Sequence, residues 1–132
     1  MAPNDQKFNI EVESNGLINL TLVGKLTGVN LVALDKWTKE VHNIIKDRYE
    51  NTYAPVKVII DIGSVTDYSP EAVTILTELL IEDKQYVYRS AAYGGNQYIL
   101  MAQDMLVSLS GRTNFKAFRT ADEAKTWVST MS

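Results

Sequence analysis

The chain has 132 residues, of which 45% are hydrophobic and 22% are charged, with a formal net charge of −3 and no cysteine. This composition predicts a globular domain that buries a core, and it excludes disulfides, thiol catalysis and thiolate metal sites. The acidic balance argues against nonspecific nucleic-acid binding, which needs a basic surface. Neither a signal-peptide pattern nor an apolar window of roughly 20 residues is present, so we expect a cytoplasmic domain that stands alone, without a membrane span.

The first expected element is a β-hairpin. Residues 1–6 are polar, and we expect them to be disordered. Apolar and polar residues alternate over residues 8–12, as in a half-buried strand, and residues 17–23 return as a second strand. Asn15 and Gly16 between these runs predict a two-residue hairpin turn.

The next pattern is an amphipathic helix over residues 31–49, where apolar side chains recur at spacings of three and four. Trp37 occupies one of the apolar positions and is expected in or near the core. His42, the only histidine, lies on the polar flank. Because no serine or cysteine is predicted to lie beside it, a nucleophilic triad has no support.

A buried strand and a capped helix then enclose one loop. Residues 56–62 are mostly β-branched and apolar, which predicts a strand buried on both faces. Ser69, Pro70 and Glu71 are typical of a helix start, because they supply a hydroxyl N-cap, a proline at the first helical position and an acid in the first turn. The loop over residues 63–68 is the first place to look for a functional site.

Two strands and two helices complete the chain. We expect a strand over residues 86–93, a helix over residues 97–109 after a turn at residues 94–96, and a short strand over residues 115–118. Thr120 begins a capping box that leads into a last helix. The side chains expected to face inward from the third helix are Ile99, Ala102, Met105, Leu106 and Leu109, and Met101 is also expected to pack.

The resulting element order, β-β-α-β-α-β-α-β-α, predicts an α/β fold. We expect a two-layer to three-layer sandwich in which a mixed sheet of about five strands packs against four helices, with the later strands parallel. Because no linker or internal repeat interrupts the pattern, residues 1–132 are expected to form a single domain.

Short motifs accompany this element order: Asp61-Ile62, Val65-Thr66, Phe118 and Asp122-Glu123-Ala124. Together they resemble the STAS domain, the anti-sigma-factor-antagonist (SpoIIAA-like) fold, and most closely its divergent STAS/SEC14-like bacterial branch. The resemblance covers residues 8–129. It implies a non-enzymatic regulatory domain that acts by protein–protein interaction in bacterial signalling, with a kinase-like or sigma-pathway protein as partner.

One departure from the family concerns its phosphorylated serine. In the family the Val-Thr pair is followed by Asp-Ser-Ser-Gly. Aligning that pair puts Ser69 where the aspartate stands and Pro70 at the phosphorylated serine, while Glu71 and Ala72 take the next two positions. Proline cannot accept phosphate, so the kinase-switched mechanism is not expected there. Ser69 is interpreted first as an N-cap and second as a candidate phosphosite, with Ser64 as another serine that a kinase could use.

Two turns at one edge of the predicted sheet form the candidate partner-binding site. Ligands of open α/β sheets gather at the carboxyl ends of strands, and tyrosine is enriched at interaction hot spots. Tyr98 lies beside these turns. The candidate partner-binding residues are Asp67, Tyr68, Ser69, Glu71, Tyr93, Gly94, Gly95 and Asn96.

Cofactor chemistry has less support at this edge. Asp61 and Asp67 could hold a hard cation, but the phosphate-binding parts that usually accompany Mg²⁺ are absent from the sequence. Residues 94–96 lack the G-x-G-x-x-G spacing of a nucleotide loop. We therefore expect no metal and no cofactor.

The sequence leaves three kinds of function open. The leading hypothesis is the non-enzymatic STAS-like regulator. The alternative is a small-molecule or lipid-binding module of the SEC14-like type, in which the tyrosines near the two turns line a pocket for a small apolar ligand. An enzyme is third, because no catalytic constellation is present, and a homodimer that completes a site between chains is its one route.

Overall fold

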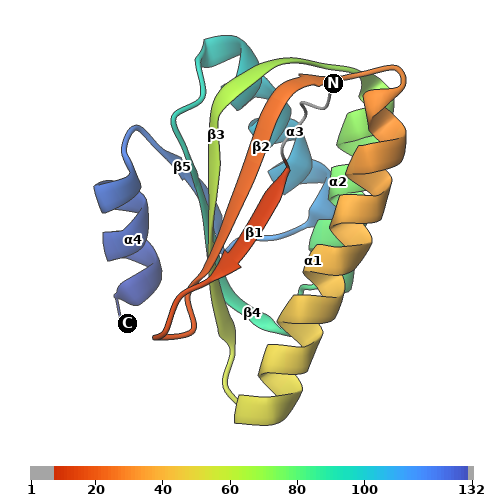
Figure 1. Cartoon of the computed structure of the whole chain (residues 1–132). Helices are drawn as coiled ribbons and strands as arrows, with labels where there is room; N and C mark the ends of the chain where they lie inside the picture. The colour runs from red at the N-terminus through yellow and green to blue at the C-terminus, as the bar shows by residue number, and fades with distance from the viewer. Residues whose placement is uncertain (1–7, 131–132) are drawn as a thin grey trace.

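The structure, a computed structural model, describes residues 8–130 and is an α/β sandwich (Figure 1). This part of the chain contains five strands and four helices, which confirms the expected fold class. The expected disorder over residues 1–6 lies outside the described residues. In chain order the elements are β1 (Asn9–Val12), β2 (Ile18–Leu26), α1 (Asn30–Thr52), β3 (Val56–Tyr68), α2 (Pro70–Glu82), β4 (Val87–Tyr93), α3 (Gln97–Ser110), β5 (Phe115–Phe118) and α4 (Ala121–Ser129).

The sheet follows the order of the sequence, β1-β2-β3-β4-β5. β1 pairs antiparallel with β2, and every later pair is parallel, as the element order predicted. Helices α1, α2 and α3 cover one face of the sheet and α4 covers the other (Figure 1). All the parallel strands therefore end at one edge of the sheet, and the helices that follow them begin there.

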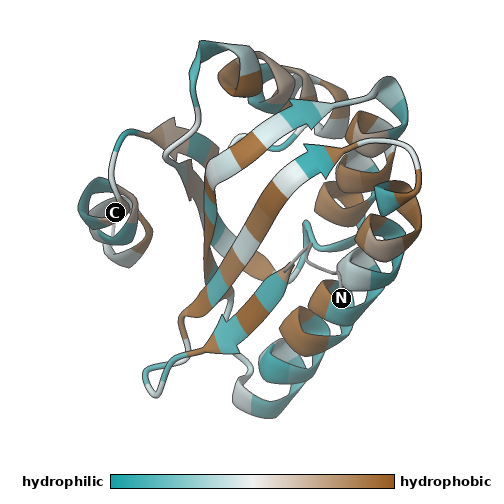
Figure 2. Ribbon diagram, turned by 45° about the horizontal axis from the view of Figure 1, so that its top comes forward, coloured by the Kyte–Doolittle hydropathy of each residue, from teal (hydrophilic) through white to brown (hydrophobic). Residues whose placement is uncertain are grey.

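The core has two parts because β3 is buried on both faces. Val58 packs with residues of α1, α2 and α3 in the larger part, whereas Ile59 packs with Ala124 and Val128 of α4 in the smaller part. Figure 2 shows the hydrophobic residues of α1 and α2 gathered on the side that is turned toward the sheet. No helix within residues 8–130 is long and apolar enough to cross a membrane.

β3 extends six residues beyond its expected end at Ile62, so the prediction of a loop over residues 63–68 is wrong. The reason is that β2 also continues, to Leu26, and offers a pairing partner along this whole length. Lys25 pairs with Asp67 and Leu26 with Tyr68, after two shifts in register.

The hairpin turn also differs from its prediction. The backbone N–H of Glu13 donates to the carbonyl of Leu17 at 2.8 Å, so three residues rather than two form the loop. The N–H of Gly16 donates to the carbonyl of Glu13 at 2.8 Å, and Gly16 has a φ of +92°. This is the three-residue hairpin in which glycine takes the left-handed position.

The orientation of α3 is the largest difference from the predicted packing. Ile99 and Leu106 are buried as expected, but Met105 and Leu109 are 41% and 62% exposed, and Met101 is 60% exposed. The side chains of Gln103 and Ser110 are buried in their place. The expectation that Met101, Met105 and Leu109 pack inward is therefore wrong, because the helix is rotated so that a mixed face meets the sheet.

Candidate functional site

The carboxyl end of β3 is tied to the start of α3 by two tyrosines. The hydroxyl of Tyr98 donates a hydrogen bond to Oδ1 of Asp67 at 2.8 Å. The rings of Tyr68 and Tyr98 stack, with centroids 4.8 Å apart and an angle of 28° between their planes. The structure thus brings together the end of β3 and the start of α3, two segments that the sequence placed at one edge.

The same two segments approach each other closely through their backbones. A Cβ atom at Gly94 would lie 3.1 Å from Cα of Gly63, and Gly94 has a φ of +90°. Both the space and the conformation require glycine at this turn. Gly94 therefore holds the β4–α3 turn against β3, which keeps Tyr98 within reach of Asp67.

The Asp67 carboxyl is held in its charged form. The hydrogen bond from Tyr98 lowers the pKa of Asp67, and the backbone N–H of Tyr68, at 2.8 Å, lowers it further. The same bond raises the pKa of the Tyr98 hydroxyl. The edge consequently presents a fixed carboxylate beside two aromatic rings at neutral pH.

Ser69 is the N-cap of α2, as the sequence predicted. Its hydroxyl accepts a hydrogen bond from the N–H of Ala72 at 3.3 Å and donates one to the carbonyl of Leu26 at 3.4 Å. Pro70 occupies the first helical position, and Glu71 is exposed in the first turn. A cap of this kind contributes about 1 kcal/mol to stability.

The β4–α3 turn is organised by similar local bonds. The side chain of Asn96 accepts from the N–H of Ile99 at 2.9 Å and so caps α3. Oδ1 of Asp61 accepts from the N–H of Gly63 at 2.9 Å, which is a role in backbone orientation. Within residues 8–130 no three His, Asp or Glu side chains gather as metal ligands would.

The ring of Tyr93, which was also predicted as a site residue, lies apart from the rings of Tyr68 and Tyr98. It is partly buried against the cluster of α4 and β5, together with Phe118 and Trp127. Burial, and then the neighbouring charge of Asp61, raise the pKa of the Tyr93 hydroxyl. Tyr93 therefore lies on the face covered by α4, whereas Tyr68 lies on the face covered by α2 and α3.

Two valines beside this edge are exposed, which sequence analysis did not predict. Val29 and Val32, at the start of α1, are 88% and 77% exposed. The α1 start lies next to the α2 start, because the N–H of Ser69 donates to the carbonyl of Leu26. The sequence did indicate the exposure of Val32, because Val32 does not share the helical spacing of the buried residues Leu34 and Trp37.

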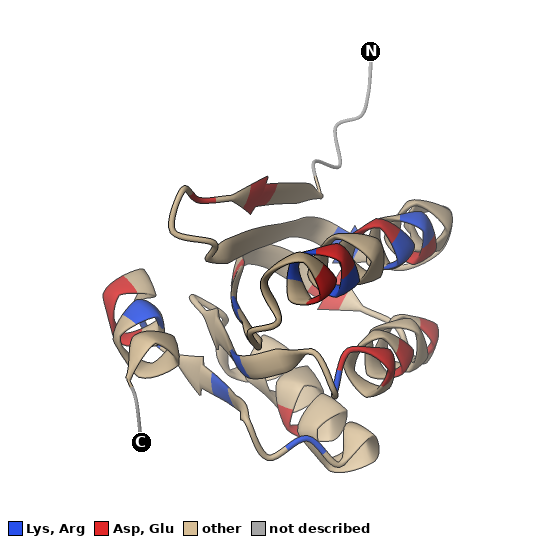
Figure 3. Ribbon diagram, turned by 90° about the horizontal axis from the view of Figure 1, so that it is seen from below, with Lys and Arg blue, Asp and Glu red and all other residues tan. Residues whose placement is uncertain are grey.

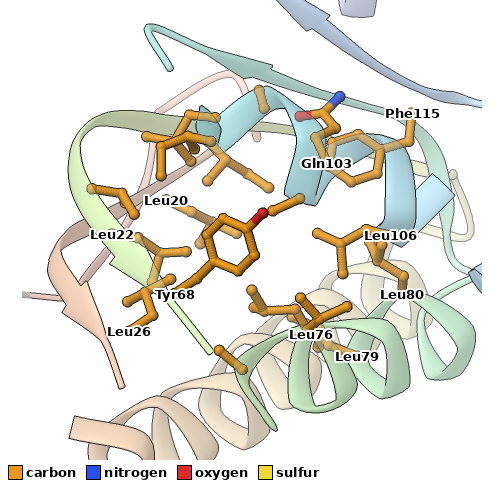
Figure 4. Close-up of a pocket in the computed structure, with 18 of the residues that line it drawn as sticks. Leu20, Leu22, Leu26, Tyr68, Leu76, Leu79, Leu80, Gln103, Leu106 and Phe115 are labelled. Carbon is orange, nitrogen blue, oxygen red and sulfur yellow. The ribbon is translucent and has the colours of Figure 1, made fainter. Parts of the chain in front are cut away.

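An apolar cavity lies beneath this edge, between the sheet and helices α2 and α3. Its volume is about 80 Å³, and its lining is almost entirely hydrophobic. Figure 4 shows the ring of Tyr68 among leucines of β2 and α2, with Gln103 of α3 as an amide in the lining. Tyr68 thus contacts both the cavity and, through Tyr98, the exposed edge.

A buried polar cluster occupies the opposite end of the sheet, and sequence analysis did not identify it. The guanidinium of Arg112, whose side chain is 1% exposed, donates to the carbonyl of Leu80, to Oγ of Ser90 and to Oδ1 of Asn114. Nδ1 of His42 lies 2.6 Å from Oδ1 of Asp83. Burial raises the pKa of Asp83 to about 6, although its contact with His42 acts in the other direction.

Comparisons with known proteins agree on the fold. No protein-family model and no curated protein sequence matches the chain. Among solved structures, the chain is similar to SpoIIAA, an anti-sigma factor antagonist in its unphosphorylated form, with a TM-score of 0.67 and 13% identity over 95% of this chain and 100% of that one.

Two further structures show the same architecture. A DUF3478-family protein from Shewanella loihica with a SpoIIAA-like fold has a TM-score of 0.63 and 19% identity, over 97% of this chain and 98% of its own. A candidate anti-sigma factor antagonist from Thermotoga maritima has a TM-score of 0.64 and 15% identity, over 93% and 95%. The chain therefore has the SpoIIAA-like fold, the fold of STAS domains, as its motifs predicted.

Proposed function

We propose that this chain is a non-enzymatic regulatory domain of bacterial signalling, which binds a protein partner through the edge surface. This surface consists of Asp67, Tyr68, Ser69, Glu71, Tyr93, Gly94, Gly95 and Asn96. The observation that carries the proposal is the bond between Tyr98 and Asp67 together with the ring stack of Tyr98 on Tyr68. These contacts fix a carboxylate and two tyrosine rings at an exposed edge, and tyrosine is a residue type that is enriched at interface hot spots.

The surroundings of the edge surface support a protein partner. Val29 and Val32 expose large apolar side chains beside it, and clustered apolar exposure is typical of interaction sites. Tyr93, Gly94 and Asn96 contribute mainly by shaping the turn that holds Tyr98. The solved structures with this fold include an anti-sigma factor antagonist, which is consistent with a regulatory role.

Binding is proposed to be independent of a phosphate at the family's serine position. Pro70 stands there, and the exposed carboxylate of Glu71 next to it supplies a permanent negative charge at the helix start. The hydroxyl of Ser69 is engaged with Ala72 and Leu26, so phosphorylation of Ser69 would compete with the cap. Ser64, exposed on β3, is the other candidate phosphosite.

The test is affinity capture from the native source with wild-type protein and two variants. Glu71→Lys and Tyr68→Ala are each expected to lose the partner that the wild type retains. Glu50→Lys is the matched control, because it makes the same charge change at an exposed position in the last turn of α1. If both edge variants retain every protein that the wild type captures, the proposal is wrong. An intact mass that includes a phosphoryl group would restore a switch and direct the search to Ser69 and Ser64.

A second candidate function, binding of a small apolar ligand, is favoured by the cavity beneath Tyr68. Its volume of about 80 Å³ is smaller than the roughly 150 Å³ of an apolar cavity that binds benzene. The ligand would thus be a group of a few carbon atoms. Native mass spectrometry of gently isolated protein is expected to show a noncovalent adduct if this function is real, and a bare protein mass counts against it.

A further inference from the structure

One side of α3 exposes a row of large apolar side chains. We call this row the α3 stripe; its members are Tyr98, Met101, Met105 and Leu109, which are 46%, 60%, 41% and 62% exposed. Their spacings of three, four and four residues place them on one side of the helix, over about 16 Å of its length. The core contacts of α3 come from other positions, such as Ile99 and Leu106. Met101, Met105 and Leu109 therefore contribute little to folding and remain available, whereas Tyr98 also contacts Asp67 and Tyr68.

The charged residues within α2 and α3 all have one sign. Helices α2 and α3 pack against each other, and neither contains a Lys or Arg (Figure 3). All four charged residues of these two helices are acidic and exposed. They are Glu71, Glu78, Glu82 and Asp104. An apolar row with acidic surroundings selects for a partner that is both apolar and positively charged.

We infer that the α3 stripe is the docking surface for a cationic amphipathic helix of a partner protein. Side chains at three- and four-residue spacing match the apolar face of such a helix, which anchors with the same period. Met101 and Met105 suit this role because their flexible thioether side chains adapt to a partner's shape. Lys or Arg on one flank of the partner helix would lie near Asp104, the charged residue of α3 itself.

The same charges argue against two other occupants. A second copy of this chain would bring its own acidic helices against these, and like charges across an interface cost free energy. The anionic surface of a membrane would likewise repel α2 and α3. The α3 stripe shares Tyr98 with the support of the edge surface but otherwise lies apart from it, so this inference does not depend on the proposed function.

The experiment uses a designed 18-residue peptide of leucine and lysine that forms an amphipathic helix, with a leucine–glutamate peptide of the same apolar face as control. Binding is measured by fluorescence anisotropy, and the contact is located by the methyl NMR signals of Met101 and Met105. We expect the lysine peptide to bind and to shift both signals, and the glutamate peptide to leave them unchanged. Added salt should weaken the binding.

Variants of the full chain locate the site. Met101→Lys combined with Leu109→Lys is expected to weaken binding of the lysine peptide by about tenfold or more, which corresponds to about 1.4 kcal/mol. Val12→Lys is the control, because it replaces an exposed valine on the edge strand β1. Circular dichroism of each variant shows whether its helices are retained. Asp104→Lys reverses the charge on α3 by a single substitution and leaves the side chains of the α3 stripe unchanged.

Four outcomes would overturn the inference. They are equal binding of the two peptides, equal binding by the wild type and the stripe variants, a dimer that the stripe variants dissociate, and binding to phosphatidylglycerol vesicles without binding to the lysine peptide. The third outcome would assign the stripe to a second copy and the fourth to a lipid surface.

Discussion

The two ends of the sheet hold polar side chains in different ways. At the end where β4 begins, Arg112 is buried and its guanidinium donates to three separate acceptors. At the end where β3 stops, Asp67 and Tyr98 are bonded to each other at the surface and keep further hydrogen-bonding capacity toward solvent. Burial keeps the Arg112 guanidinium out of a partner's reach, whereas Tyr98 is 46% exposed. The comparison separates polar residues that stabilise the fold from those available for recognition.

The largest effect is expected from breaking the buried cluster. Arg112→Met keeps an unbranched side chain but removes every donor, which leaves the carbonyl of Leu80 and the buried polar groups near it without this partner. Each buried acceptor that is left without a partner costs about 1–3 kcal/mol, so we expect the free energy of unfolding, measured by urea denaturation, to fall by roughly 3 kcal/mol or more. Lys36→Met, at an exposed position of α1, is the control and should change stability by no more than about 0.5 kcal/mol. If Arg112→Met lowers the free energy of unfolding by less than about 1 kcal/mol, the polar residues at the two ends of the sheet contribute alike to stability.

An intermediate effect is expected from the titration of Asp83. Its pKa is about 6 in the folded chain and 3.8 as the ordinary value, so the folded state binds more protons between these two pH values. Stability from the protonated carboxyl is therefore present near pH 4 and is lost as pH rises through 6. Relative to Asp83→Asn, the wild type should lose up to about 3 kcal/mol over this window, measured by urea denaturation at each pH.

The control for this titration is Asp47→Asn, which removes an exposed carboxyl of α1. The same measurement on this variant shows how much of any pH dependence follows from the loss of a surface carboxyl in general. If the wild type instead gains stability relative to Asp83→Asn as pH rises, the contact with His42, rather than burial, has the larger effect on the Asp83 carboxyl.

The smallest effect is expected at the exposed end. Tyr98→Phe keeps the ring that stacks on Tyr68 but removes the hydrogen bond to Asp67. The pKa of Asp67 should rise toward its ordinary value, as carbon-detected NMR titration would show, while stability changes by no more than about 0.5 kcal/mol. Tyr53→Phe, at an exposed tyrosine after α1, should leave the Asp67 titration unchanged. An unchanged titration in Tyr98→Phe would remove the bond on which the edge surface depends.

Features set by local sequence could be predicted, and those set by distant partners could not. The caps at Ser69 and Thr120 were predicted because a cap bonds only to the next few residues. The extension of β3 was missed because it depends on β2, and the bond between Arg112 and Leu80 joins residues 32 positions apart. The proximity of the two segments that make up the edge surface could be predicted, because parallel strands end at one edge. Its pairing of Tyr98 with Asp67 needed the register of the folded chain.

The side of α3 that is buried was predicted wrongly for a different reason. Apolar residues occur on two sides of this helix, so helical periodicity alone does not distinguish the side that meets the sheet from the α3 stripe. Burial of Gln103 and Ser110 then contradicts the hydrophobic pattern. Such a mismatch between pattern and packing is itself a reason to examine the exposed side.

The order of the strands has a consequence for how the chain is made. Because the sheet follows the sequence from β1 to β5, each strand pairs with the edge left by the strand before it, and none has to insert between two strands already paired. Chains emerge from the ribosome with the N-terminal part first, and their folding begins there. The hairpin of β1 and β2 can therefore serve as the template on which each later strand and helix is added during synthesis.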